Sequence, residues 1–258
     1  MKFRFLFAAP AALLLTLGAA NAAQVAALIG NDTIAMVDTS QKRATSSVRV
    51  TGISGALIGI DVRPADGMLY GLVDDGTIVT IAMDGRATVK SRLDAILGKG
   101  VIATVDFNPV ADRLRVMGAN GVNLRVNVDD GKVTQDGDHR YGDTDMHRGE
   151  RPNIVAGAYT NSVKGAKETA LYDIDGTIGG LIKQAPPNDG VLGAVGKLGM
   201  KADRVAFDIW SDGAGRNEAW LMTGNTLYSV DLATGKATEA AKISGVTGAV
   251  RDIAIIRM

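Results

Sequence analysis

The chain has 258 residues, with 28 basic and 28 acidic side chains, 32 glycines, two histidines and no cysteine. This balance of charge argues against a protein that depends on electrostatic attraction to nucleic acid or to an anionic membrane. The absence of cysteine excludes thiol nucleophiles, iron–sulfur clusters, covalently attached haem, zinc–thiolate sites and disulfides. Only four of the acidic residues are glutamates, and because aspartate and glycine favour turns, the composition indicates an all-β fold.

Residues 1–22 have the pattern of a secretory signal peptide. Two basic residues precede an apolar run over 5–17, and small residues at 20 and 22 form a cleavage site. The run is too short to span the roughly 30 Å hydrocarbon core of a bilayer. We expect cleavage after Ala22 and a mature chain, 23–258, that is periplasmic or secreted and is not inserted into a membrane. The alternative is a membrane anchor that is never cleaved.

The mature N-terminus begins with three short segments of strand-forming residues, at 26–30, 33–38 and 45–50. An apolar–Asp–apolar motif then recurs at intervals of 45, 52, 50 and 44 residues. Its copies are centred at Asp61, Asp106, Ala158 (a weaker copy without the aspartate), Asp208 and Asp252.

Short β segments follow each of the first four copies. In the first unit they cover 68–72, 77–81 and 87–90, and Asp-Gly pairs, which favour tight hairpins, lie between them. Four short strands in every 40–50 residues are typical of a β-propeller blade.

The two ends of the chain complement each other. The last copy of the motif, at Asp252, has one strand and no successors, whereas the N-terminus has three strands and no first one. Counted around a closed ring from Asp252 to the C-terminus and on from Ala23 to Asp61, the interval is 45 residues, which matches the others. The sequence therefore predicts a single β-propeller domain with five four-stranded blades, the last closed by strands from both termini.

The first strand of each unit lines the central channel of a propeller, so the repeated aspartates should gather near one axis. These inner-strand carboxylates are Asp61, Asp106, Asp208 and Asp252. They either accept backbone N–H bonds and tie each blade to its neighbour, or bind a cation or a cationic ligand. A residue that recurs in nearly every repeat usually serves the repeat itself, which favours the structural role.

Units two and three depart most from the repeat. Arg115 and Arg125 lie on strands where other units have mainly apolar or small residues, and arginine is a bidentate donor to carboxylate or phosphate. The alternative is ion pairing with Asp106, Asp112 or Asp129. With polar residues of neighbouring units they define a candidate ligand-binding rim: Arg63, Arg115, Asn123, Arg125, Tyr159, Asn161, Asn188 and Asp189.

A polar segment over 136–152 holds both histidines, His139 and His147, and four aspartates. Imidazole and carboxylate groups can ligate a divalent cation, but no ligand spacing here is diagnostic. The alternative is a solvated loop whose aspartates make turns and pair with nearby arginines. We predict no metal and no other cofactor, and whether Asp136 to His147 binds a cation stays open.

Six short motifs resemble, in order, the signatures of the bacterial "domain of unknown function 4394" family. They are Gly59 to Pro64, Asp106 to Pro109, Asp112 to Val116, Asn123 to Asn127, Ala158 to Asn161 and Pro186 to Gly190. The resemblance covers nearly all of 26–256, although the acidic stretch 136–150 departs from the family's usual run. It implies an exported protein with propeller-like repeats, and it assigns no reaction and no catalytic residue.

The sequence contains no G-x-S-x-G elbow, phosphate-binding loop or HExxH motif, and we assign no catalytic residue. The first hypothesis is a monomeric, non-enzymatic exported propeller that binds an unknown small molecule or protein at one face of the ring. The second is a hydrolase or lyase that acts on a glycan or similar polymer through carboxylates or a cation near Asp61, Asp106 and Asp208. That enzyme needs two carboxylates about 5–10 Å apart in an open cleft. A third is a scaffold without a ligand.

Overall fold

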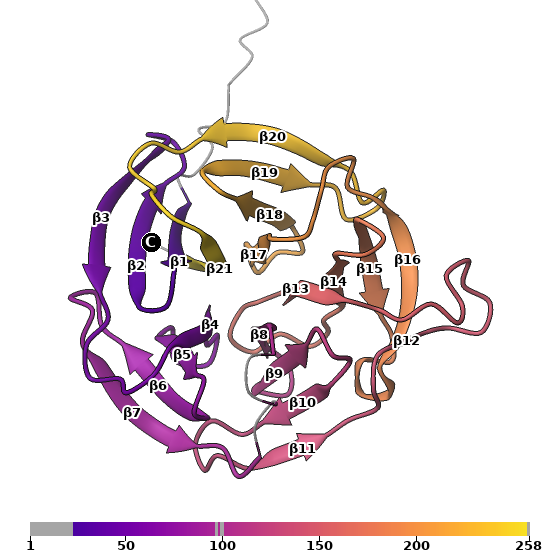
Figure 1. The fold of residues 1–258 in the computed structure, drawn as a ribbon, viewed down its shortest axis with the longest axis horizontal. Helices are drawn as coiled ribbons and strands as arrows, with labels where there is room; N and C mark the ends of the chain where they lie inside the picture. Colours follow the sequence, from indigo (N-terminus) through magenta and orange to yellow (C-terminus); the bar gives the residue numbers. More distant parts are fainter. Residues whose placement is uncertain (1–22, 96–97, 99–100, 257–258) are drawn as a thin grey trace, which may run out of the picture.

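The computed structural model describes residues 23–256 apart from 96–97 and 99–100. The chain forms five β-sheets, antiparallel except for one short parallel pair, that are arranged around a central axis like the blades of a propeller (Figure 1). This confirms the predicted fold class; the predicted signal peptide lies outside the described residues. Within those residues, no helix is long and apolar enough to cross a membrane.

Three blades are four-stranded meanders, in which each strand pairs with the next along the chain. Blade 1 contains β4 (Leu57–Val62), β5 (Leu69–Val73), β6 (Thr77–Ile81) and β7 (Ala87–Arg92). Blade 2 contains β8 (Ala103–Asn108), β9 (Arg113–Gly118), β10 (Asn123–Val126) and β11 (Val133–Gln135). Blade 4 contains β17 (Ala206–Ser211), β18 (Asn217–Thr223), β19 (Thr226–Val230) and β20 (Ala237–Lys242).

Blade 3 has an additional strand. Its meander contains β13 (Ile154–Tyr159), β14 (Leu171–Asp175), β15 (Gly180–Gln184) and β16 (Val191–Lys197), with the 3-10 turn η1 (Pro187–Asp189) before β16. The short β12 (Arg140–Tyr141) pairs in parallel with β16 at the outer edge of the sheet. The polar segment between units two and three therefore adds a fifth strand to this blade.

Blade 5 joins the two ends of the chain. It contains β21 (Val250–Ile256), β1 (Gln24–Ile29), β2 (Thr33–Asp38) and β3 (Arg43–Arg49). The innermost strand, β21, pairs antiparallel with β1, from Gln24 opposite Ile256 to Leu28 opposite Asp252. The predicted closure of the ring by strands from both termini is thus confirmed.

The core lies in the five seams between blades, because each inner strand is covered on both faces and reads as a nearly continuous apolar run. Between blades 1 and 2, for example, the Tyr70 ring meets Phe107 edge-on with centroids 5.2 Å apart. The seam between blades 2 and 3 has a smaller apolar cluster: Met117, Tyr141, Ile154, Tyr159, Leu171, Ile182 and Leu192. Polar side chains fill much of the rest of that seam.

Close packing of the inner strands requires a residue without a side chain at Gly59. A Cβ atom there would lie 2.7 Å from Val105 Cγ2 and 2.9 Å from Asp252 Oδ2. The predicted Asp-Gly hairpins also form: Gly85 turns the chain from β6 to β7 with φ +84, and a Cβ atom would lie 2.5 Å from the Arg49 carbonyl oxygen.

Candidate functional site

The four repeated aspartates do gather at the axis, on β4, β8, β17 and β21. All four are buried, and carboxylate oxygens of Asp61, Asp106 and Asp208 lie within 4.8 Å of one another. Among the described residues, these three are the only acidic or histidine side chains that lie close enough together to share a metal ion.

Each axial carboxylate accepts a hydrogen bond from a backbone N–H of the next blade. Asp252 accepts from Ile60 at 2.9 Å, Asp61 from Phe107 at 2.7 Å, Asp106 from Tyr159 at 2.9 Å and Asp208 from Ile255 at 2.6 Å. These bonds are the blade-to-blade ties expected if the repeated aspartate serves the fold.

Blade 3 carries Ala158 in place of the aspartate, and its tie to blade 4 is built differently. The Asn161 N–H donates to Asn217 Oδ1 at 2.7 Å, and Asn217 Nδ2 donates back to Asn161 Oδ1 at 3.0 Å. Asn161, which we predicted for the ligand-binding rim, thus lies in this interblade contact, with a left-handed φ of 54.

Burial shifts the acidity of the axial group strongly. Desolvation, reinforced by the neighbouring carboxylates, raises the pKa of Asp61, Asp106 and Asp252 well above 3.8. Desolvation also raises the pKa of Asp208, to about 6, against the effect of its two backbone hydrogen bonds. The axial carboxylates therefore hold protons at pH values where exposed aspartates are ionised.

Five of the eight predicted rim residues meet in the seam between blades 2 and 3, around the Arg115 guanidinium. Its Nε donates to the Tyr159 hydroxyl at 3.1 Å, and Nη2 donates to Asn188 Oδ1 at 2.8 Å. Nη1 donates to Asn123 Oδ1 at 2.9 Å and to Asp136 Oδ2 at 2.6 Å. We call these residues, with Arg125, the Arg115 network.

Arg125 completes this network from the solvent side. Its Nε and Nη2 donate to the two oxygens of Asp136 at 2.7 and 3.0 Å. The Arg115 side chain is only 1% exposed, whereas that of Arg125 is 33% exposed. The partner of both arginines is Asp136, and not the aspartates considered from the sequence. The network joins blades 2 and 3, with its central guanidinium closed to solvent.

Unpartnered polar groups surround the same network. Among the described residues, neither oxygen of the buried Asp173 has a hydrogen-bond partner, and the buried His139 ring has only the Gln184 side chain close by as a weak partner. Burial and the nearby Arg115 lower the pKa of His139 to about 4, so its imidazole is neutral at pH 7. Burial raises the pKa of Asp173 well above 3.8, and its carboxyl group lies beside Gly157.

Two other predicted rim residues lie apart from the network. Arg63 is buried between blades 1 and 2, where it binds Asp112 with two hydrogen bonds of 2.8 and 2.6 Å and also donates to Asp129. Asp189 is exposed, and its backbone oxygen accepts from Arg140 at 2.6 Å. The eight rim residues thus occupy several blade junctions.

The segment 136–152 separates its two histidines. His139 is buried, whereas His147 Nδ1 lies 3.1 Å from Glu150 Oε2 and the His147 ring lies 5.3 Å from the Tyr141 ring. Asp145 accepts from the backbone N–H of His147 within the segment and from that of Ala194 on β16, so it ties the segment to blade 3. The described side chains of this segment form no group that could share one metal ion.

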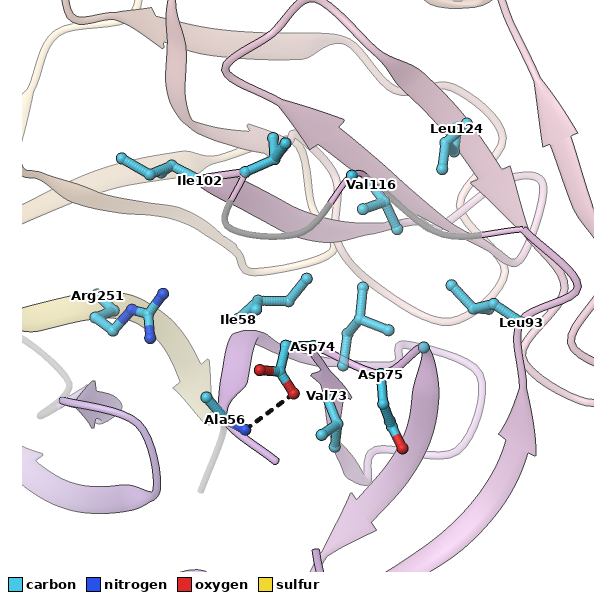
Figure 2. A pocket seen from close by; sticks show the side chains of 14 residues that line it. Ala56, Ile58, Val73, Asp74, Asp75, Leu93, Ile102, Val116, Leu124 and Arg251 are labelled. Atoms are coloured by element: carbon cyan, nitrogen blue, oxygen red, sulfur yellow. Dashed lines mark hydrogen bonds between the residues drawn. The ribbon is translucent and has the colours of Figure 1, made fainter. Parts of the chain in front are cut away.

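A cavity of about 510 Å³ lies between blades 1 and 2 (Figure 2). Its walls are mostly apolar, and they include Ile58, Leu72, Val73, Leu93, Ile102, Val116 and Leu124. Asp74, Asp75 and Arg251 supply charged groups at its edge. Sequence reasoning missed this cavity, because its walls carry the apolar alternation expected of any blade.

A local irregularity at Ile58 shapes this wall. Leu57 pairs with Val73 and Gly59 with Leu72, so Ile58 is the extra residue of a β-bulge. A bulge re-aims a side chain, and Figure 2 shows Ile58 directed into the cavity.

Comparison with known proteins defines the family but no activity. The chain matches no curated protein. A protein of unknown function from Bacteroides caccae is 12% identical, with a TM-score of 0.45 over 92% of this chain and all of that one. A structural genomics protein of unknown function from Bacteroides thetaiotaomicron is 15% identical, with a TM-score of 0.51 over 92% of this chain and 67% of that one, and shares the fold. The model of the domain of unknown function DUF4394 matches residues 33–254, and the chain belongs to this family.

Proposed function

We propose that this protein is an exported, non-enzymatic propeller that binds a small molecule in the cavity between blades 1 and 2. The observation that carries the proposal is the cavity itself, at about 510 Å³. Small-molecule sites in proteins occupy roughly 300–1,000 Å³ and combine apolar walls with a few polar groups. The cavity has this composition.

Part of the cavity wall comes from packed strands. Val116 and Leu124 lie on paired strands of blade 2 and are buried in the same core cluster as Leu72 and Leu93. Packed strands keep their shape, so a ligand loses little free energy in ordering this part of the wall.

The contacts of the axial carboxylates favour a non-enzymatic role. A polymer hydrolase needs two carboxylates in an open cleft, one of which gives a proton to the leaving group. Here the carboxylates are buried, and Asp61, Asp208 and Asp252 each use both oxygens to accept backbone N–H groups. Such groups hold strands together and leave few lone pairs for a substrate.

The variant Ile58→Phe should lower the affinity of the cavity for an apolar probe by about tenfold or more. The benzyl group of phenylalanine is larger than the butyl group of isoleucine and occupies space that the ligand would need. The affinity of an apolar site comes mainly from buried apolar surface, so the loss of that contact weakens binding. Fluorescence titration of the mature protein with the uncharged probe N-phenyl-1-naphthylamine measures this affinity.

The matched control is Val110→Phe, which adds a ring at a residue 49% exposed on the loop between β8 and β9. It should bind the probe like the unmodified protein. If the probe does not bind in a saturable manner, or if both variants bind it equally, the cavity is not a ligand site.

Export makes a separate prediction. The protein purified from the periplasm or medium of a bacterial culture should begin at Ala23, because the cleavage site ends at Ala22. N-terminal sequencing reads this directly. A control precursor with Leu14→Arg, which interrupts the apolar run, should stay in the cytoplasm with its N-terminus uncleaved. Recovery of both precursors in the cytoplasm would contradict export.

A further inference from the structure

We propose that the ligand of this cavity is an apolar α-amino acid, whose carboxylate binds Arg251 and whose ammonium group binds Asp74. The inference rests on the proposed function, since it names the ligand class of the same site. It follows from which charged groups at the cavity edge already have partners and which do not.

Among the described residues, Arg251 forms no salt bridge, although its charge acts at longer range on the neighbouring Asp252. Its Nη1 donates to Asn31 Oδ1 at 2.9 Å, which is a neutral acceptor. Among the residues that the structure describes, no carboxylate lies within 4.0 Å of its guanidinium nitrogens. Since a guanidinium has five N–H donors, Arg251 retains the fork of donors that a carboxylate accepts in bidentate fashion.

Asp74 is an anion whose carboxylate can accept further hydrogen bonds. Its Oδ1 accepts from the Ala56 N–H at 3.1 Å, the contact dashed in Figure 2, and its side chain is otherwise open at the cavity edge. In that view Asp74 and Arg251 lie on the same side of the cavity, away from Leu93 and Leu124.

Asp75 does not compete for this role. Its Oδ1 accepts from the Thr77 N–H at 2.9 Å, and its Oδ2 lies 3.5 Å from the Ser54 hydroxyl and 3.8 Å from Arg92 Nη2. These contacts lower the pKa of Asp75, so its carboxylate is ionised and already has partners for its charge. Figure 2 shows its carboxylate directed away from the apolar walls.

The edge of the cavity therefore offers one available cation and one available anion beside apolar walls. A purely anionic ligand would satisfy Arg251 and be repelled by Asp74, and a purely cationic ligand would do the reverse. A zwitterion satisfies both groups. In an α-amino acid the ammonium group, the carboxylate and the apolar side chain are attached to the same carbon. With its two charged groups at the cavity edge, the ligand can place that side chain in the cavity between Ile58 and Val116.

The test is calorimetric titration of the mature protein with L-leucine and with two analogues that each lack one charge, 4-methylpentanoate and 3-methylbutylamine. Leucine should bind about tenfold or more tightly than either analogue, because each analogue loses a charge-assisted interaction. The variants Arg251→Gln and Asp74→Asn should each weaken leucine binding by a similar factor and leave the uncharged naphthylamine probe unaffected. Asp74→Asn retains an oxygen to accept the Ala56 N–H, so it should fold.

The control variant is Arg216→Gln, which removes an exposed arginine that pairs with Glu218 in blade 4. It should leave leucine binding unchanged. If the uncharged probe binds but leucine binds no better than its analogues, or if the two edge variants behave like the control, the amino-acid assignment is overturned while the cavity remains a ligand site. If neither the probe nor leucine binds, the proposed function itself fails.

Discussion

Replacing Arg115 with methionine should lower the free energy of unfolding by about 3–5 kcal/mol. The guanidinium is 1% exposed and donates to four groups of two blades, at 2.6 to 3.1 Å. Methionine fills a similar space but donates nothing, so Asn123, Asn188 and the Tyr159 hydroxyl lose a buried partner, and Asp136 keeps Arg125 alone. Equilibrium unfolding in urea, followed by tryptophan fluorescence, measures the loss.

The matched control is Arg125→Met, which removes the other arginine from the same Asp136. Its side chain is 33% exposed and water can replace part of its contact, so the expected loss is about 1 kcal/mol. Equal losses for the two variants would show that burial does not set the value of these contacts. A loss below about 1 kcal/mol for Arg115→Met would mean that the Arg115 network does not hold blades 2 and 3 together.

The ring could be predicted because its parts recur in the sequence. Each Asp of the motif ends up on an inner strand, and the interval of 45 residues across the termini places β21 beside β1. The two-residue periodicity of the strands and the Asp-Gly turns are local signals, and the chain obeys them locally. Blade number and closure follow from these signals without knowledge of any long-range contact.

The partners of the polar residues could not be predicted in the same way. Arg115 and Asn188 are separated by 73 residues, and they meet because η1 brings its loop across the seam. The sequence suggested Asp106, Asp112 or Asp129 as partners of the blade 2 arginines, whereas Asp112 and Asp129 instead bind Arg63. Pairing depends on the path of the loops, and many aspartates in one sequence fit any one arginine.

The cavity escaped prediction for a different reason. Its walls, such as Leu93 and Val116, are core residues of blades 1 and 2, and the alternation that buries them says nothing about how well they fill the seam. A gap is a property of packing among many side chains. Asp74 and Arg251 likewise stand out only once their neighbours in space are known.

Asp106→Asn should become progressively more stable than the unmodified protein as the pH rises from about 4 to about 8. Burial and the other axial carboxylates raise the pKa of Asp106 well above 3.8. A raised pKa means that the folded chain keeps a proton that the unfolded chain has lost, so stability is complete below pH 3.8 and is lost as pH rises through the folded pKa. Asparagine does not titrate, so the variant escapes this loss. Asp208, whose pKa rises to about 6, sets the scale at about 3 kcal/mol.

The matched variant is Asp252→Asn, at the equivalent position on β21. Asp106 accepts one backbone N–H, from Tyr159, and asparagine retains that acceptor. Both oxygens of Asp252 accept backbone N–H groups, from Ile60 and Ile253, so an asparagine there must place its NH₂ against one of those donors.

At about pH 4, where the aspartates are largely protonated, Asp252→Asn should therefore be less stable than the unmodified protein by about 1–3 kcal/mol, while Asp106→Asn should match it. Comparing each variant with the unmodified protein by urea unfolding at each pH removes the opposite contribution of His139, whose lowered pKa makes stability rise with pH below about 6.5. If Asp106→Asn shows no pH-dependent gain, the axial aspartates are not held protonated by the fold. If the two variants are equal at low pH, the second backbone bond of Asp252 does not stabilise the ring. Either result would mean that the four axial aspartates do not act together. The expected pattern would show that the fold keeps them protonated and that their backbone hydrogen bonds tie the blades together.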